Sequence, residues 1–257
     1  MTFKEWIFST YPNPAIKGQW GVLHILTLII CAGLIIGITF LFKNKSEKDK
    51  KIVIGVFAGI ILFFEIVVRV VNFLKLEVFT FDTIVNVILP QPWCAISCWC
   101  VIFCLIVNKK FFYNWTSFSA LLCSMIFFSY PGRGYNNQYI LFTNLYSIIT
   151  HALILITPIL LITLKFTDFK FKTIWKELIF LFSVFCYAFL EIYVFKCEAD
   201  PLYFMPNNDI QTVAGLSYPW FLVGYILFIS FYISLFYLIN DRKNVKEFFL
   251  KFKKKKQ

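Results

Sequence analysis

The chain has two histidines, His24 and His151, and both fall inside long apolar stretches. An imidazole titrates near neutral pH and can serve as a general base. Asn144, Ser147 and His151 recur at i, i+3 and i+7, so a helix places them on one polar stripe that ends in the histidine. This stripe predicts either a polar cavity that leads to a base or a hydrogen-bonded contact between helices.

Glu65 and Arg69 are ionisable residues within another apolar stretch, and their i, i+4 spacing allows a direct ion pair on a helix. Asn72 follows on the same helical face. Charged groups inside an apolar helix are costly and mark candidate functional sites. Two roles stay open: the pair ties helices together, or it orients a lipid headgroup or a catalytic imidazole.

Cys94 is the best placed for chemistry of the eight cysteines. It follows Leu89-Pro90-Gln91-Pro92, where two prolines remove backbone donors and disfavour a continuous helix. A cysteine at the start of the next helix gains from the helix dipole, which favours the nucleophilic thiolate. A neighbouring histidine would activate it further, whereas the alternative is an inert buried thiol. The cysteines lack the loop-borne spacing of structural zinc sites, so we expect no bound metal.

Composition restricts the kind of protein that can carry these residues. Hydrophobic residues make up 60% of the 257 residues, charged residues make up 15%, and the mean hydropathy is +0.74. A soluble domain contains about 45–50% apolar and about 25% charged residues. The composition therefore predicts an all-α polytopic membrane protein, and it argues against a soluble enzyme, a disordered chain or a free nucleic-acid-binding protein.

Seven apolar stretches are long enough to cross a bilayer, whose core of about 30 Å needs about 20 helical residues. They cover roughly 20–42, 52–73, 84–107, 112–130, 139–164, 174–195 and 212–239. Each should be a helix, because lipid offers no partner to free backbone groups. Pro90 and Pro92 predict a broken start to the third helix. We expect one integral membrane domain over residues 1–257, with a basic tail at 241–257.

The basic residues predict the orientation of this seven-helix bundle. Nineteen of the 25 lysines and arginines fall on one side of it, in the loop 43–51, after the third and fifth helices, and in the tail. The positive-inside rule places that side in the cytoplasm and the N-terminus outside, and we expect a multi-pass protein of the cell membrane. The basic tail either binds anionic lipid or acts as a stop-transfer flank after the last span. The net charge of +11 therefore does not call for nucleic acid.

Four segments share their order and residue pattern with a known family. They are Trp20-Gly21-Val22-Leu23-His24-Ile25; Glu65 with Leu89-Pro90-Gln91-Pro92-Trp93-Cys94-Ala95-Ile96-Ser97; Ser147-Ile148-Ile149-Thr150-His151-Ala152-Leu153; and Met205-Pro206-Asn207-Asn208 with Ser217-Tyr218-Pro219-Trp220. Together they resemble the YwaF-type bacterial integral membrane proteins, which are related to the eukaryotic transmembrane acyltransferases of ether phospholipids. The resemblance covers nearly the whole chain.

The resemblance implies a histidine-centred site within the membrane, in which His151 matches best and His24 next. The chain departs from the family pattern at Pro92, where the family has histidine, and at Ala95, where it has serine. In the eukaryotic enzymes the reactive cysteine directly follows the proline, a position that Gln91 occupies here. The resemblance therefore bears more on the fold and the location of the site than on its chemistry.

Two functions of different classes fit these features. The first is a lipid acyltransferase or lipid hydrolase, with membrane lipids as partners and no cofactor. In that enzyme the catalytic candidates are His151, Cys94 and His24, and the substrate-binding candidates are Glu65, Arg69, Asn144, Ser147 and Trp220. The second is a lipid-handling protein or transporter without catalysis, for which broken helices are typical. A structural membrane subunit is the third possibility, and the oligomeric state is not predicted.

Overall fold

The computed structural model describes residues 2–8, 20–91, 93–129, 135, 139–196, 211, 214–242, 244 and 246. Every regular element within these residues is a helix. The elements are α1 (Phe3–Phe8), α2 (Val22–Phe42), α3 (Glu47–Leu74), α4 (Phe81–Ile88), α5 (Trp93–Val107), α6 (Lys110–Ser129), α7 (Phe142–Thr163), the 3-10 turn η1 (Phe171–Thr173), α8 (Ile174–Tyr193) and α10 (Tyr218–Asn240). Pro92, the segment 205–208 and the end of the basic tail lie outside the described residues.

The predicted all-α membrane bundle is confirmed. Six of the helices are long and apolar enough to cross a membrane, and the pair formed by α4 and α5 makes a seventh span if the two are counted together. These two helices meet at a bend of 60°, where the sequence has its proline-rich break. The break therefore lies at the start of the third span, as the two prolines predict.

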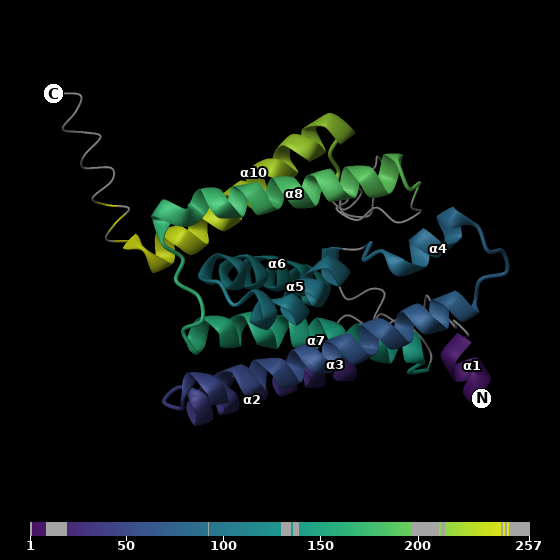
Figure 1. The fold of residues 1–257 in the computed structure, drawn as a ribbon, viewed down its shortest axis with the longest axis horizontal. Helices are drawn as coiled ribbons and strands as arrows, with labels where there is room; N and C mark the ends of the chain where they lie inside the picture. Colours follow the sequence, from purple (N-terminus) through teal and green to yellow (C-terminus); the bar gives the residue numbers. More distant parts are fainter. Residues whose placement is uncertain are drawn as a thin grey trace.

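The helices are arranged around α5, α6 and α7. Helix α7 packs against α2, α3, α5 and α6, and α5 packs against α3, α6 and α7. Helices α8 and α10 form a separate pair that contacts the rest mainly through α6 (Figure 1). This arrangement surrounds α5, the short helix that carries Cys94, with three neighbours.

Local sequence explains where the helices that flank the site begin. Ser46 caps α3 by accepting a hydrogen bond from the Asp49 amide, and Glu47 and Asp49 in the first turn suit the helix dipole. Thr80 and Thr83 form a reciprocal capping box at the start of α4. Helix α4 ends at Ile88, and its C-cap Leu89 is extended, as expected for a residue before proline.

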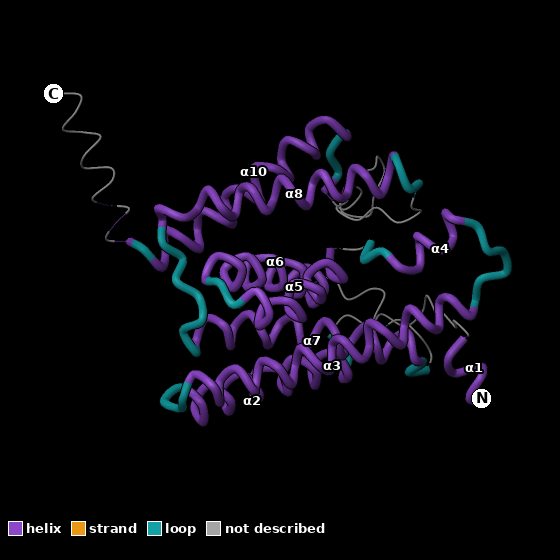
Figure 2. The backbone as a smooth tube through the Cα atoms, viewed as in Figure 1, coloured by secondary structure: helices purple, strands orange, loops and turns teal. Residues whose placement is uncertain are grey.

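Consecutive spans run in opposite directions, so the connections alternate between the two ends of the bundle. The turns after α2, α5 and α7 lie together at one end, on the left in Figure 2, and α1 and α4 lie at the other end. The basic residues of loops 43–46, 108–109 and 164–173 are thereby collected at one end. Their clustering agrees with the charge pattern, while the side of the membrane on which they lie stays a prediction.

The outward surfaces of the long helices are apolar. Val22 on α2 is 76% exposed, and large apolar side chains of α3, α8 and α10 are exposed in the same way. A water-soluble monomer rarely exposes contiguous apolar patches larger than a few hundred Å². The exposed apolar belt therefore fits a multi-pass membrane protein whose outer helices face lipid.

Candidate functional site

His151 projects from the middle of α7, and two contacts hold its ring. Its Nδ1 lies 2.7 Å from the backbone carbonyl of Ser147, and its ring stacks on Phe127 at 3.6 Å between centroids. A carbonyl oxygen can only accept a hydrogen bond, so Nδ1 carries the proton. In this tautomer an imidazole carries its lone pair on Nε2, which is the form that a general base requires.

Cys94 is the second residue of α5, directly after the proline-rich break. Its thiol lies within hydrogen-bonding reach of the His151 imidazole and of the Cys123 thiol on α6. Both Cys94 and His151 are only partly buried, whereas Cys123 is buried. The structure therefore brings together a thiol and an imidazole from two helices that are far apart in sequence, and neither residue is fully buried.

A chain of small polar groups continues from this pair between α5 and α6. The Ser97 hydroxyl lies 3.3 Å from the Cys123 sulfur and 2.8 Å from the Ser119 hydroxyl. The Trp93 indole N–H donates to the same Ser119 oxygen at 2.7 Å. Because Trp93 is the first residue of α5, this network fixes the start of the helix, and with it Cys94, against α6.

Glu65 and Arg69 form the predicted ion pair, with 2.5 Å between Oε2 and Nη1. Glu65 is fully buried, and its other carboxylate oxygen accepts a hydrogen bond from the Tyr146 hydroxyl at 2.9 Å. The Cys98 thiol is also within hydrogen-bonding reach of this carboxylate. Cys94 and Cys98 are one turn apart on α5, so the ion pair lies about one helical turn from the thiol–imidazole pair.

Arg69 also connects α3 to the break that precedes α5. Its Nε donates to the Ile88 carbonyl at 3.0 Å, and its guanidinium lies 5.3 Å from the centre of the Trp99 ring. Ile88 is the last residue of α4, so its carbonyl lacks an intrahelical donor. The guanidinium therefore stabilises the end of α4 while it neutralises Glu65.

His24 is fully buried on α2 and is held by aromatic neighbours. Its Nδ1 accepts a hydrogen bond from the Trp20 amide at 3.1 Å, and its ring contacts Phe128 and Tyr135 at centroid distances of 6.0 and 5.1 Å. Within the described part of the chain, no contact joins its ring directly to His151. The two histidines share a group of aromatic neighbours rather than one reaction centre.

The remaining predicted site residues are placed at different distances from the pair. Ser147 lies one turn before His151, and its hydroxyl is 3.4 Å from Nδ1. Asn144 is buried about one turn before Ser147 on the same helix. Trp220 is 69% exposed on α10, and the structure does not bring it to this cluster. The polar stripe on α7 thus reaches the candidate site, and the start of α10 does not.

Five further residues of the cluster are not singled out by sequence reasoning. They are Cys98, Cys123, Ser119, Phe127 and Tyr146. A tyrosine in an apolar helix needs a hydrogen-bond partner for its hydroxyl. This need is the feature of the sequence that marks Tyr146 as a residue in contact with another polar group. The two thiols carried no such signal, because a cysteine in a helix of this kind usually packs as a small apolar residue.

Comparison with known proteins identifies the family of the chain. The sequence model of the TMEM164 family matches residues 18–237, which include every residue of the candidate site. No curated protein and no solved structure gives a match. The resemblance to YwaF-type proteins and to acyltransferases stays a prediction. Because the family match extends over most of its length, the chain belongs to the TMEM164 family of transmembrane proteins.

Proposed function

We propose that this protein is a membrane-embedded acyltransferase that uses Cys94 as a nucleophile and His151 as its general base. The observation that carries the proposal is the contact between the Cys94 thiol and the His151 imidazole, with Nδ1 of that imidazole bound to a backbone carbonyl. A nucleophile beside a base that is oriented by a third group is the general signature of covalent catalysis.

The reaction follows from this geometry. Nε2 of His151 takes the thiol proton, and the Cys94 sulfur attacks the carbonyl carbon of an acyl ester or thioester. The bond to the leaving group breaks, the leaving group takes the proton from His151, and the acyl chain stays on Cys94 as a thioester. His151 then deprotonates an acceptor hydroxyl, which attacks the thioester and restores the free thiol. If water replaces the acceptor, the same steps amount to hydrolysis.

Surrounding groups suit the two negative charges that these reaction steps involve, the Cys94 thiolate and the anionic group of the substrate. Cys94 lies in the first turn of α5, where the positive end of the helix dipole stabilises a thiolate. Arg69 keeps 18% of its side chain exposed, and its Nη2 group has no hydrogen bond within the described residues. We assign that group to the phosphate or carboxylate of the substrate, with Glu65 holding the guanidinium in place.

A lipid substrate fits the position of the pair better than a water-soluble one. Both residues lie on apolar helices within the membrane-spanning bundle and are only partly buried, so an acyl chain that reaches them does so from within the bilayer. We also propose the cell membrane as the location, with the basic end of the bundle in the cytoplasm. The thiol–imidazole pair then lies toward the outer leaflet.

Lipid handling without catalysis is the second candidate, and the broken span formed by α4 and α5 favours it. Discontinuous helices beside polar groups are typical of transporters, in which they form substrate sites. On this alternative the same cluster binds a lipid and releases it unchanged. The two functions differ in whether loss of the Cys94 thiol changes the chemical composition of the lipids.

The test is a lipid profile of cells that lack the protein and are complemented with defined variants. We expect wild type to shift acyl chains between lipid classes and His151→Ala to lower that turnover by about 10²–10⁴-fold, the usual contribution of a general base. Cys94→Ala should be as damaging, because coupled catalytic groups fail together. Cys186→Ala is the matched control, since this cysteine is exposed on α8. Unchanged turnover in both site variants would refute catalysis by Cys94 and His151. No lipid turnover by the wild-type protein would favour lipid handling without catalysis.

A further inference from the structure

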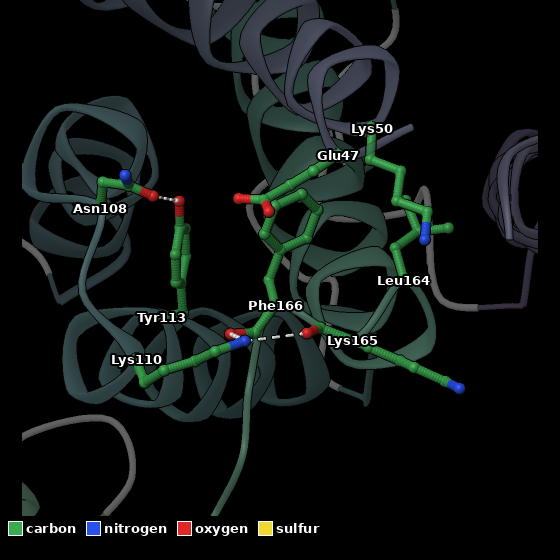
Figure 3. Close-up of a pocket in the computed structure, with 8 residues that line it drawn as sticks. All are labelled: Glu47, Lys50, Asn108, Lys110, Tyr113, Leu164, Lys165 and Phe166. Carbon is green, nitrogen blue, oxygen red and sulfur yellow. Dashed lines mark hydrogen bonds between the residues drawn. The ribbon is translucent and has the colours of Figure 1, made fainter. Parts of the chain in front are cut away.

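A second candidate site lies at the opposite end of α5 from Cys94. It is a cavity of about 390 Å³ lined by the start of α3, the turn between α5 and α6, the first turns of α6 and the end of α7 (Figure 3). Ligand sites commonly have volumes of about 300–1,000 Å³. The cavity lies at the end of the bundle that collects the basic loops, so it occupies the level at which four helices leave the apolar zone.

The cavity is rich in cationic groups. Three of its four charged lining residues are lysines, Lys50, Lys110 and Lys165, and the fourth, Glu47, is paired with Lys51 at 2.8 Å. Lys110 is held in place by the carbonyls of Lys165 and Phe166, at 3.0 and 2.8 Å (Figure 3). The ammonium groups of Lys50 and Lys165 have no hydrogen bond or ion pair within the described residues. Figure 3 shows the Lys165 side chain extended away from Lys110, so it reaches an anion in the cavity by rotation of its flexible side chain.

Lys165 has a left-handed backbone conformation at the end of α7. Helix α7 ends in a Schellman motif, in which the amide of Phe166 bonds the Leu161 carbonyl at 2.9 Å and the amide of Lys165 bonds the Ile162 carbonyl at 3.1 Å. The residue after such a helix end is left-handed and is usually glycine, yet Lys165 has φ of 68°. Lys165 therefore occupies a position at which glycine would be less strained, and it lines the cavity.

Apart from Asn108, whose Oδ1 accepts a hydrogen bond from the Tyr113 hydroxyl at 2.9 Å, the remaining walls are largely apolar. The side chains of Tyr113, Leu164 and Phe166 border the cavity and are 3%, 3% and 5% exposed. Apolar walls beside several cations suit a ligand that combines an anionic group with a carbon skeleton. An anionic phospholipid meets this description at the level where its headgroup lies, and basic clusters at the ends of membrane helices commonly bind such lipids.

We propose that this cavity binds a phosphate-bearing anion, supplied either by the headgroup of an anionic phospholipid or by free phosphate. Lys50 and Lys165 contact the phosphate, and Lys110 fixes the turn that presents Lys165. Glu47 borders the same space, so its negative charge limits the affinity. This binding does not depend on the Cys94–His151 chemistry, because the two sites lie at opposite ends of α5.

The test measures binding to the purified full-length protein in neutral detergent. The probes are dihexanoyl phosphatidylglycerol, dihexanoyl phosphatidylcholine and inorganic phosphate. The binding of each probe is measured by thermophoresis. We expect saturable binding of the phosphatidylglycerol, weakened about tenfold or more in Lys50→Gln/Lys165→Gln. Lys43→Gln/Lys45→Gln removes two charges from the neighbouring loop outside the cavity and should change the affinity less than about twofold. Glu47→Gln should tighten binding.

Two comparisons separate the sources of phosphate and guard against misfolding. Inorganic phosphate that binds with the same variant dependence would assign free phosphate as the ligand, whereas phosphatidylglycerol alone would assign the lipid. Lys165→Gly should lower the affinity while the ligand-free Tm stays the same or rises, because glycine relieves the left-handed strain. The proposal is overturned if neither anion binds saturably, if Lys165→Gly and the double lining variant bind like wild type, or if the control loop variant loses as much affinity as the lining variant.

Discussion

Glu65 is the buried charge on which the polar cluster depends. Its carboxylate is fully buried and is contacted by Arg69, Tyr146 and the Cys98 thiol. A charge removed from water is tolerated only when it is paired and hydrogen-bonded. These contacts come from α3, α5 and α7, so the carboxylate also joins the three helices that surround the candidate site.

The ion pair should therefore show strong coupling. Arg69→Met leaves the Glu65 carboxylate buried and unpaired, and we expect it to cost about 3–5 kcal/mol of unfolding free energy. The double variant Glu65→Gln/Arg69→Met removes both charges and should cost less than Arg69→Met alone. The unfolding free energy is measured by denaturant titration in mixed detergent micelles.

A second ion pair in the same helix provides the control. Glu47 and Lys51 have the same i, i+4 spacing on α3, but Glu47 is 75% exposed. Exposed pairs contribute little, so Glu47→Gln and Lys51→Met should have small, additive effects. Equal and additive losses at Glu65 and Arg69 would show that the buried pair does not interact as the structure describes.

The identity of the site residues is more predictable from sequence than their contacts. His151, Cys94, Glu65 and Arg69 stand out because ionisable or reactive groups are rare in apolar helices. Which of them meet depends on how each helix is rotated about its axis, and a single sequence does not determine that rotation. His24 shows the consequence, since it has the same chemistry as His151 but packs among aromatic rings instead of beside a thiol.

At the scale of the helices, hydropathy predicts the part of each helix that lies in lipid. Helix α3 begins at Glu47, five residues before the predicted span at 52, because Ser46 caps it and charged residues extend it beyond the apolar zone. Hydropathy does not predict helix α1, because its six residues are too few to give a membrane signal. The sequence predicts the third span as one broken segment because proline has a strong local effect on the backbone.

The break between α4 and α5 should control the position of Cys94. Helix α5 has 15 residues, so it spans only about 22 Å, and its first turn is set by the break. Pro90→Ala removes one constraint and should let helical structure spread across the break, which moves Cys94 relative to His151. A shift of about 1 Å can cost about 10²-fold in rate, and we expect a loss of this order in lipid turnover.

The matched substitution for this prediction is Pro219→Ala. Pro219 lies in the first turn of α10, where proline is tolerated without bending the helix. It should leave turnover unchanged, and both variants should keep their helical circular dichroism. If Pro90→Ala is also fully active, the break does not position the nucleophile.

For the whole molecule, the central expectation is its direction in the membrane. The described loops alternate between the two ends of the bundle, and the basic ones share one end. Single cysteines introduced at Lys45 and Lys170 should react with a membrane-impermeant maleimide only after the cells are opened, because positive loops stay in the cytoplasm. A cysteine at Glu77, at the other end, should react in intact cells, and the unmodified chain gives the background. The reverse labelling pattern would invert the orientation and move the candidate site to the inner leaflet.

The most direct test of the proposed chemistry is to find the acyl chain on the nucleophile. Cells are grown with an alkyne-tagged fatty acid, which labels every acyl donor whatever its class. The protein is then isolated after rapid acid quenching, and its peptides are mapped before and after hydroxylamine, which cleaves thioesters. Cys186→Ala serves as the control for general labelling of exposed thiols.

We predict a hydroxylamine-sensitive acyl group on Cys94 in the wild-type protein and in Cys186→Ala. His151→Ala should lower its formation by about 10²-fold or more, since the thiol then lacks its base. An untagged Cys94 in cells whose lipids carry the label, or tagging of Cys94 that does not change in His151→Ala, would contradict the assignment of these two residues as a catalytic pair.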